Sequence, residues 1–286
     1  MFYRLKQLVK SILKQGIKGW YRVVGFFRKH GIVITTNGKK LLSYRDKHQG
    51  ERCFLIGNSP SLTAEDLETI KDEKSMACNI IYRLFDKVSW RPTYYFISDV
   101  VAIYAVLKEG ALDQITGRQL FVNSDAYRKM KGDLKNVVSV SCVNQREYKV
   151  SKNILAYYIP AQATVMTFMI EMAIYMGFSE IYLLGVDCTN TFTAGHFGTD
   201  YTDKAVDEYN LKRMQKKLNR PDLTLVELGE ERRKRSLDAY EKLKVYAEER
   251  GVKIYNATRG GALEVFTRVD FEKLFIEKSV EKNEEP

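Results

Sequence analysis

The chain has 286 residues, of which 46 are Lys or Arg and 36 are Asp or Glu, and 45% are hydrophobic. This is the composition of a globular protein with a sizeable core, and it excludes collagen-like, low-complexity and linker-dominated architectures. The positive charge is concentrated at one end: residues 1–48 carry twelve basic residues and one acidic residue, whereas the rest carries 34 basic and 35 acidic residues. Because the main body is nearly neutral, we expect no nucleic-acid partner.

Residues 1–30 combine a basic stripe with an apolar stripe. The two stripes recur every four residues and consist of Lys6, Lys10, Lys14 and Lys18 beside Leu5, Val9, Leu13 and Ile17. This spacing predicts a basic amphipathic helix, within an N-terminal segment 1–48, that lies on an anionic membrane surface. Docking of this helix on its own domain or on a partner chain is the alternative, and Gly16 and Gly19 oppose a continuous helix.

The four cysteines are far apart in the sequence and show neither zinc-ligand spacing nor a disulfide framework. They indicate a reduced, cytoplasmic protein. There is no secretory signal and no run of about 20 uncharged apolar residues. We therefore expect a protein that does not span the membrane but lies on its inner face.

Beyond residue 52, short β-rich runs alternate with longer helical ones. The predicted strands lie within 53–59, 75–81, 93–99, 119–125, 136–142, 180–187 and 252–258, and the clearest helices are 63–70, 164–176 and 236–250. This alternation predicts an α/β domain over residues 49–276, with a mostly parallel, Rossmann-like sheet flanked by helices. The charged stretch 200–235 predicts a helical insertion. It is either a solvated helical segment or an element that closes over the site or binds the acceptor. Residues 277–286 read as a disordered tail.

Most of the predicted strands end in small polar or acidic residues. These are Asn58, Asn79, Asp99, Asn123 with Asp125, Asp187 and Asn256. Each one alone is typical of a turn or a helix cap. Because ligands of open α/β sheets bind outside the carboxyl ends of the strands, the recurrence predicts one shared site at that edge.

The sharpest local feature is the run Gly57-Asn58-Ser59-Pro60-Ser61 between the first strand and the first helix. Gly57 permits a tight turn, and the hydroxyls and amides that follow can hold a phosphate at a helix N-terminus. The run lacks the lysine of a P-loop and the three glycines of a dinucleotide fingerprint. The alternative is an ordinary strand-turn-helix in which Thr63 caps the helix and Asp66 completes the capping box.

Two further segments are candidates for chemistry. Thr164 and Thr167 lie one turn apart at the start of a predicted helix, where they can receive an anion, while the Met-rich body of that helix predicts core packing. His196 lies in a glycine-flanked loop after the strand 180–187. A histidine there is a candidate general base, the alternative being a solvated side chain.

Two absent motifs narrow the chemistry. The sequence has no Asp-x-Asp, the usual metal-binding device of transferases that use nucleotide-diphosphate sugars, and no Gly-x-Ser-x-Gly elbow or Cys/His nucleophile pairing. We therefore expect no metal site and no bound cofactor. A metal-free transferase fits better with a donor that leaves as a nucleoside monophosphate.

Several of these residues together carry a resemblance to a known family. They are the run GNSPSL, Cys78-Asn79, Asp99, the run TVMTFMIEMAIYMGFSEIYLLGVD and the run NATRGGALEVF. In this combination the chain resembles the MptE-like family, named for an archaeal 6-hydroxymethylpterin diphosphokinase, which includes the core of flagellin-glycosylating motility accessory factors. The layout is also similar to that of bacterial CMP-sialic-acid sialyltransferases. The resemblance covers residues 52–275.

The resemblance implies a role for each matching residue. Asn58, Ser61 and Asn79 would bind the nucleotide, with Gly57, Ser59 and Pro60 in the same loop, and Thr164 would lie near the phosphate or sugar. His196 would deprotonate the acceptor. The chain departs from the sialyltransferases where their Thr-Ser-Gly aligns with Thr164-Val165-Met166, and the stretch after His196 has no clear counterpart. The fold that the resemblance implies is a variant of the glycosyltransferase-A type.

Together these observations predict a glycosyltransferase that needs no metal and uses a CMP-activated nonulosonate-type donor, with a glycan or lipid-linked acceptor. The candidate donor-binding residues also include Asp99, Asn123, Thr167 and Asp187. The alternatives are a diphosphokinase acting on a pterin-like alcohol, with Mg²⁺ on Asp99, Asp125 and Asp187, and a non-catalytic nucleotide-binding module. The oligomeric state stays open.

Overall fold

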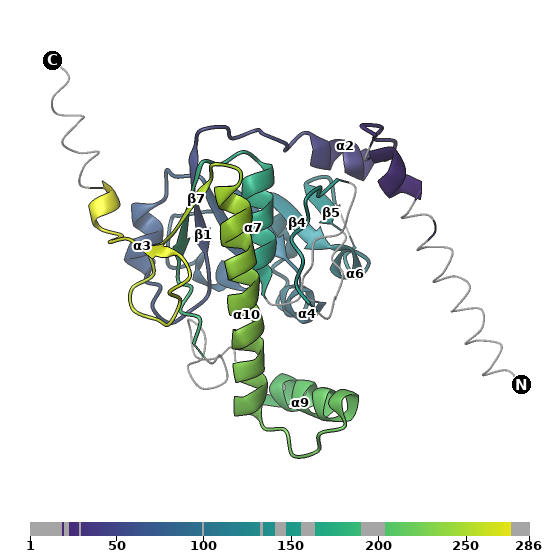
Figure 1. The fold of residues 1–286 in the computed structure, drawn as a ribbon, viewed down its shortest axis with the longest axis vertical. Helices are drawn as coiled ribbons and strands as arrows, with labels where there is room; N and C mark the ends of the chain where they lie inside the picture. Colours follow the sequence, from purple (N-terminus) through teal and green to yellow (C-terminus); the bar gives the residue numbers. More distant parts are fainter. Residues whose placement is uncertain are drawn as a thin grey trace, which may run out of the picture.

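The computed structural model describes residue 19 and residues 23–28, 30–98, 100–131, 134–140, 147–155, 164–189 and 204–275. Within these ranges the chain forms an eight-stranded sheet in the order β5-β4-β3-β2-β1-β6-β7-β8, and every pair of neighbours is parallel (Figure 1). The strands are β1 (Arg52–Ile56), β2 (Ser75–Cys78), β3 (Tyr94–Ile97), β4 (Gln119–Asn123), β5 (Val137–Val140), β6 (Glu180–Leu184), β7 (Lys253–Asn256) and β8 (Thr267–Arg268). All seven predicted strands are present, and the parallel, Rossmann-like sheet is confirmed.

The order of the strands reverses between β1 and β6. From β1 the chain adds β2 to β5 successively on one side, and it then returns to place β6 on the other side of β1. β1 and β6 pair over their full length, from Arg52 beside Glu180 to Ile56 beside Leu184. In open α/β sheets a reversal of this kind opens a crevice at the carboxyl ends of the two strands, and that is where ligands bind.

Helices cover both faces of the sheet, because successive side chains of each buried strand point to opposite faces. One face packs on α2 (Thr36–Leu42), α7 (Val165–Tyr175) and α10 (Leu225–Glu248). The other packs on α3 (Ala64–Thr69), η1 (Ile81–Leu84), α4 (Val100–Lys108), α5 (Leu112–Thr116) and α6 (Ser124–Tyr127). In β1, Cys53 and Leu55 belong to the first core, and Phe54 and Ile56 belong to the second. The result is a three-layer α/β/α arrangement.

Two of the predicted helices have their expected limits, and the third is longer than predicted. α3 begins after Thr63, which forms the capping box with Asp66, and α7 begins after Thr164 and ends at Tyr175. α10 starts at Leu225 rather than at residue 236, after its own capping box of Thr224 and Glu227. The charged stretch is therefore not a separate insertion over its whole length. It supplies α9 (Lys204–Leu218) and the first turns of α10 (Figure 1).

Several predictions fall on residues outside the described ranges. They are the helix of residues 1–18, Asp99, His196 and the tail 277–286. Of the helices that the structure describes, none combines the length and the apolar character needed to cross a membrane.

The loops that follow β1 and β6 hold each other in place. The Gly57 amide donates to the Leu184 carbonyl (2.8 Å), and the Ser59 amide donates to the Gly185 carbonyl (3.1 Å). The approach is so close that a Cβ atom on Gly57 would lie 2.1 Å from the Gly185 carbonyl oxygen. Position 57 therefore admits only glycine, for steric reasons.

A buried acid ties the segment 147–155 to α7. Glu171 is 1% exposed, and its carboxyl group accepts hydrogen bonds from the Tyr148 hydroxyl and from the Ser151 amide (3.3 Å). Burial raises the pKa of Glu171 to about 8 even though both hydrogen bonds favour the ionised form. The segment beside α7 is thus held by a carboxylic acid that keeps its proton in neutral solution.

Replacing Gly57 by alanine should lower the free energy of unfolding by about 1–3 kcal/mol, because the new methyl group pushes the two loops apart. Chemical denaturation measures the loss. Gly117→Ala is the matched control, since Gly117 has helical backbone angles and its added Cβ would lie at an ordinary 3.4 Å from its nearest neighbour. Equal stability of the two variants would contradict the steric account.

Replacing Glu171 by glutamine should change how stability depends on pH. Between about pH 4.5 and 8 the native protein keeps the Glu171 proton while the unfolded chain loses it, so rising pH lowers the free energy of unfolding. The glutamine can preserve both hydrogen bonds and carries no such proton. We expect the free energy of unfolding of the variant, measured relative to that of the wild type, to rise by up to about 1.4 kcal/mol per pH unit between pH 4.5 and 8. A constant difference from pH 5 to 8 in urea denaturation would show that Glu171 is ionised in the native protein.

Candidate functional site

A cavity of about 270 Å³ lies at the carboxyl ends of β1 and β6, where the strand order reverses. Five of the residues predicted from the sequence line it, and they come from three separate segments of the chain: Gly57, Asn58, Ser59, Asn79 and Thr164. The remaining wall is formed by residues after β6 and by one side of α10. The structure thus brings together residues that are more than 100 positions apart.

Side chains of the loop after β1 also connect it to its neighbours. The Asn58 amide group donates to the Cys78 carbonyl at the end of β2 (3.3 Å). The Ser59 hydroxyl oxygen accepts the Asp187 amide (3.1 Å), and the Ser61 hydroxyl donates to the Asp187 carboxylate. Ser61 and Asp187 therefore satisfy each other beside the cavity. Neither side chain lines it.

The side chain of Asn79 has a hydrogen-bond acceptor that is unpaired among the described residues. It follows β2 in the left-handed backbone region (φ 54°), with its amide donating to the Phe96 carbonyl and its carbonyl accepting the Tyr95 hydroxyl. Its side-chain oxygen Oδ1 is buried and has no hydrogen-bond partner among the residues that the structure describes. An unpaired buried acceptor costs free energy, and a ligand that donates to Asn79 removes that cost.

The N-terminus of α7 forms another side of the cavity. The Thr164 side chain caps the helix by accepting the Met166 amide (3.3 Å), and Thr164 lines the cavity together with Tyr240 of α10. Thr167 has a different role from the one predicted, because it is fully buried and its hydroxyl donates to the Thr164 carbonyl (2.8 Å). Thr164 and the positive end of the helix dipole thus face the cavity, whereas Thr167 stabilises the first turn.

Sequence reasoning missed the cations of the site. Arg232 and Arg233 of α10 line the cavity opposite the loop after β1. In the sequence they belong to the run Arg232-Arg233-Lys234-Arg235, in which solvated and ligand-facing side chains look alike. A helical wheel of α10 that starts at the Thr224 capping box would have separated them, since buried Leu228, Ala239 and Tyr240 define its inner side. Arg233 also forms an ion pair with Glu230 (3.2 Å). The two guanidinium groups and the N-terminus of α7 give this side of the cavity the groups that commonly bind anions.

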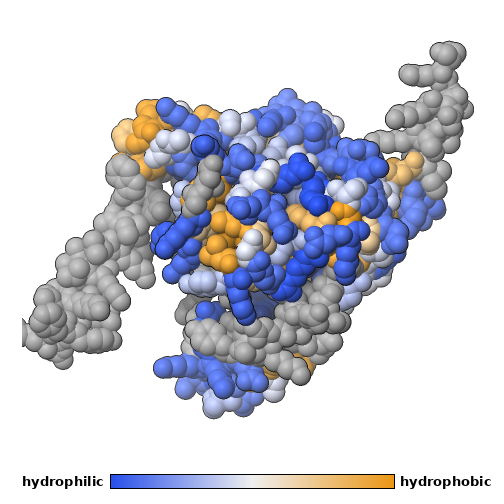
Figure 2. Space-filling view, turned by 180° about the vertical axis from the view of Figure 1, so that it is seen from behind, coloured by the Kyte–Doolittle hydropathy of each residue, from blue (hydrophilic) through white to orange (hydrophobic). Residues whose placement is uncertain are grey.

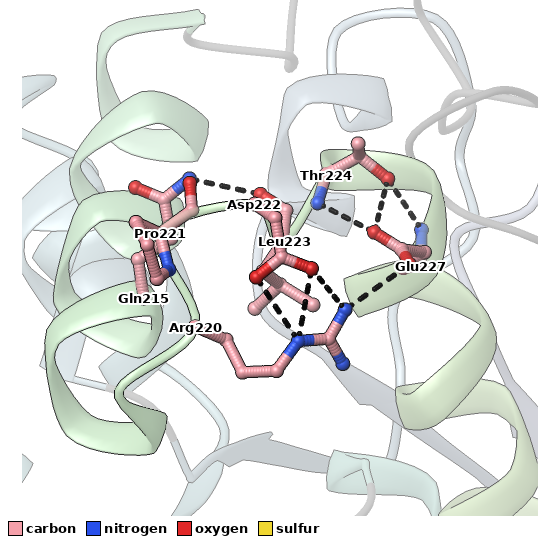
Figure 3. Close-up of polar contacts among 7 residues, drawn as sticks. All are labelled: Gln215, Arg220, Pro221, Asp222, Leu223, Thr224 and Glu227. Atoms are coloured by element: carbon pink, nitrogen blue, oxygen red, sulfur yellow. Dashed lines mark hydrogen bonds and ion pairs between the residues drawn. The ribbon is translucent and has the colours of Figure 1, made fainter.

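The turn between α9 and α10 fixes where α10 begins (Figure 3). Gln215 donates to the Pro221 and Leu223 carbonyls, and the Arg220 guanidinium lies between the carboxylates of Asp222 and Glu227. These ion pairs are exposed and contribute little to stability. Their effect is geometric, because Glu227 also completes the capping box and so sets the register of the helix that carries the two arginines.

The thiol groups at the cavity are not nucleophiles. Burial raises the pKa of Cys78 to about 12, and burial also raises the pKa of Cys188. Both therefore stay protonated at neutral pH, and a protonated thiol is a weak nucleophile. The thiols that line the cavity are therefore not candidates for a catalytic nucleophile.

The polar residues that end the strands are spread across too wide a sheet to form one common site. Asn123 ends β4, three strand positions from β1, and its side chain donates to the Ser98 carbonyl (3.0 Å). Asn256 is buried and bonds within its own turn. Pro60 is exposed and lies outside the cavity lining. The predicted shared site is therefore limited to the ends of β1, β2 and β6.

The strands that precede the carboxylates predicted to hold Mg²⁺ are not all neighbours in the sheet. The ends of β3 and β6 lie three strand positions apart, or about 14 Å at the usual spacing between strands. Asp99 lies outside the described residues, so the set Asp99, Asp125 and Asp187 stays a prediction. Among the described residues, no three His, Cys, Asp or Glu side chains gather to hold a metal ion.

Comparison with known proteins gives a similarity to a solved structure and a match to a family model. The chain is similar to the MAf glycosyltransferase from Magnetospirillum magneticum AMB-1, with 15% identity and a TM-score of 0.47 over 82% of this chain. It spans only 38% of that protein's length. No curated protein matches the chain.

The family model described as 6-hydroxymethylpterin diphosphokinase MptE-like matches residues 29–192, which include β1 to β6 and the loops that form the cavity floor. The matched residues make up more than half of the chain. The resemblance noted in the sequence is thereby confirmed, and the chain belongs to the MptE-like family.

Proposed function

We propose that this chain is a glycosyltransferase that takes a sugar from a nucleoside-monophosphate donor, a CMP-activated nonulosonate or a related acid sugar. The observation that carries the proposal is the pairing of Arg232 and Arg233 with the N-terminus of α7 across one small cavity at the strand reversal. In this proposal the negative charge of a phosphate bound in the cavity is compensated by protein groups, without a metal ion. That is what a donor with a single phosphate requires of a transferase that uses no metal.

The other polar groups suit the nucleoside part of such a donor. The unpaired Oδ1 of Asn79 accepts a hydrogen bond, and the exocyclic amino group of cytosine is a donor. The loop after β1 is fixed by its contacts with the loop after β6, so its polar atoms are in place before the ligand binds. Such preorganisation lowers the entropic cost of binding.

In the proposed reaction the acceptor oxygen attacks the anomeric carbon of the donor sugar. The acceptor hydroxyl gives its proton to His196, and the bond from the anomeric carbon to the phosphate oxygen breaks. CMP leaves with the bonding electron pair, and Arg232 and Arg233 stabilise the charge that develops on its phosphate. The assignment of His196 as base rests on its glycine-flanked position in the sequence and on the resemblance to sialyltransferases.

The family's description favours a second candidate, a diphosphokinase that transfers a diphosphate from ATP to a pterin-like alcohol. Such a reaction uses Mg²⁺ to bridge the phosphates of ATP. The two candidates therefore differ in nucleotide and in metal dependence. The acceptor of the transferase, a surface glycan or a lipid-linked glycan, is part of the same proposal.

Thermal unfolding with CMP, CDP, UDP, GDP and ATP, each with Mg²⁺ and with EDTA, separates the candidates. A ligand at 100 times its dissociation constant adds about 2.7 kcal/mol of stability. We expect CMP to raise the melting temperature equally with metal and with EDTA. A shift with ATP that requires Mg²⁺ would favour the diphosphokinase, and a nucleotide shift without turnover of any donor would favour a non-catalytic binding module.

Replacing Arg232 and Arg233 together by glutamine should weaken CMP binding at least tenfold, about 1.4 kcal/mol, because each guanidinium supports the phosphate. Isothermal titration measures the affinity. The matched control is Lys234→Gln with Arg235→Gln, which removes the same charge from the same turn of α10 at positions outside the cavity lining. If both pairs weaken binding equally, the effect comes from net charge and the cavity is not the phosphate site.

Replacing His196 by alanine should abolish sugar transfer while CMP affinity changes by less than twofold, since a general base acts on the acceptor and not on the nucleotide. Turnover of a CMP-sugar and calorimetric titration of CMP are measured on the same preparation. Transfer at the wild-type rate would remove His196 as the base.

A further inference from the structure

A second, larger cavity of about 530 Å³ lies at the opposite edge of the sheet, where α7 and α10 end. Its walls come from the turn after α2, the segment 151–154 and the C-terminal ends of the two helices. This edge carries the amino ends of the strands, because the parallel strands run from it toward the first cavity. We call it the amino-edge cavity.

Cations around the amino-edge cavity outnumber acids. Arg45, Lys152 and Arg250 line it, and the one carboxylate in the lining is that of Asp46. None of the three cations forms an ion pair with an acidic residue in the part of the chain that the structure describes. Two of them lie over aromatic rings, Arg45 over Tyr175 and Arg250 over Tyr246.

These cations are not needed to cap the C-terminal carbonyl groups of α7 and α10. The last carbonyls of α7 are already paired, because Tyr175 accepts the Asp46 amide (3.1 Å) and Met176 accepts the His48 amide (2.8 Å). At the end of α10 the Ala247 carbonyl accepts the Arg250 and Val252 amides. The charged groups of Arg45 and Arg250 are therefore available to an anion.

A buried hydroxyl group in the cavity wall also lacks a partner. Ser151 is 5% exposed, and its Oγ forms no hydrogen bond with any residue that the structure describes. Its amide is already used, since it donates to Glu171. A hydroxyl left unpaired in a protein interior is costly unless a ligand or water completes it.

Apolar side chains are exposed on the segment that precedes α2. Val23, Phe26, Ile32 and Ile34 are 48%, 61%, 49% and 52% exposed, and Figure 2 shows apolar side chains gathered over the segment that precedes α2. We call these four residues the apolar cluster. Arg28 connects it to the cavity wall, because its guanidinium donates to the Leu155 carbonyl (3.1 Å), one residue beyond Ile154 of the wall.

We propose that this end of the molecule docks on an anionic lipid bilayer, with the apolar cluster in the interfacial layer and a lipid headgroup phosphate in the amino-edge cavity. Exposed aromatic and aliphatic side chains beside unpaired cations are the combination that an anionic interface binds. In the sequence, residues 1–48 carry twelve basic residues and one acidic residue. The proposal does not depend on the transferase reaction.

Co-sedimentation of the full chain with vesicles tests the proposal. We expect the protein to partition onto equimolar phosphatidylcholine and phosphatidylglycerol at least tenfold better than onto phosphatidylcholine alone. Lys152→Glu with Arg250→Glu should reduce that partition at least tenfold, and so should Phe26→Ser with Ile32→Ser. The matched control is Lys212→Glu with Arg213→Glu, an equal charge reversal on exposed residues of α9, which should change it less than threefold. Equal losses in the cavity and control variants would overturn the proposal.

Ser151→Ala separates a lipid headgroup from a soluble phosphate. We expect this variant to fold normally and to partition at least twofold less well, because only a bound headgroup uses the Ser151 hydroxyl. Soluble glycerol 3-phosphate at constant ionic strength should not stabilise the wild type without vesicles. Stabilisation by glycerol 3-phosphate that is lost in the Lys152→Glu and Arg250→Glu variant, with vesicle binding unchanged, would overturn docking and make the cavity a site for a soluble phosphate.

Discussion

The close approach of the loops after β1 and β6 is the constraint on which the rest of the site depends. Gly57 has no room for a side chain against the Gly185 carbonyl, and backbone hydrogen bonds join the two loops on both sides of this contact. The contact requires β6 to pair with β1, although more than 120 residues separate the two strands in the sequence. The cavity is therefore a product of the topology, and residues far apart in the sequence meet there in a fixed arrangement.

The electrostatics of the cavity come from two helices on the same face of the sheet. α7 contributes its N-terminus and α10 contributes Arg232 and Arg233, and both helices pack on the same hydrophobic core. Burial keeps the thiols beside them protonated. In the chemistry that we propose, the N-terminus of α7 and the two arginines stabilise the negative charge of the departing phosphate, and His196 and an acceptor complete the reaction.

The strands could be predicted from the sequence because each is a short β-rich run bounded by turn residues, and the Thr63 and Thr164 caps marked two helices. The β1 loop, Asn79 and Thr164 could be placed at the site because parallel strands end at one edge. The grouping of Asn123 with them was wrong, since local patterns say nothing about strand order and hence about distance across the sheet. Asp187 does lie beside the cavity, but its carboxylate is paired with Ser61 and does not line the cavity. Arg232 and Arg233 were missed because the charge run hides which side of a long helix is buried. β8 has only two residues and leaves no pattern to detect.

α10 sets the spacing between the two ends of the molecule. Arg233 lines the cavity at the strand reversal and Tyr246 lines the amino-edge cavity, and both belong to one helix without a break. At the rise of an α-helix they are separated by about 20 Å. On a protein docked as proposed, the reacting hydroxyl of an acceptor has to stand at about this height above the lipid. A monosaccharide linked directly to a lipid is too short to reach it, whereas an extended oligosaccharide or a soluble glycan is long enough.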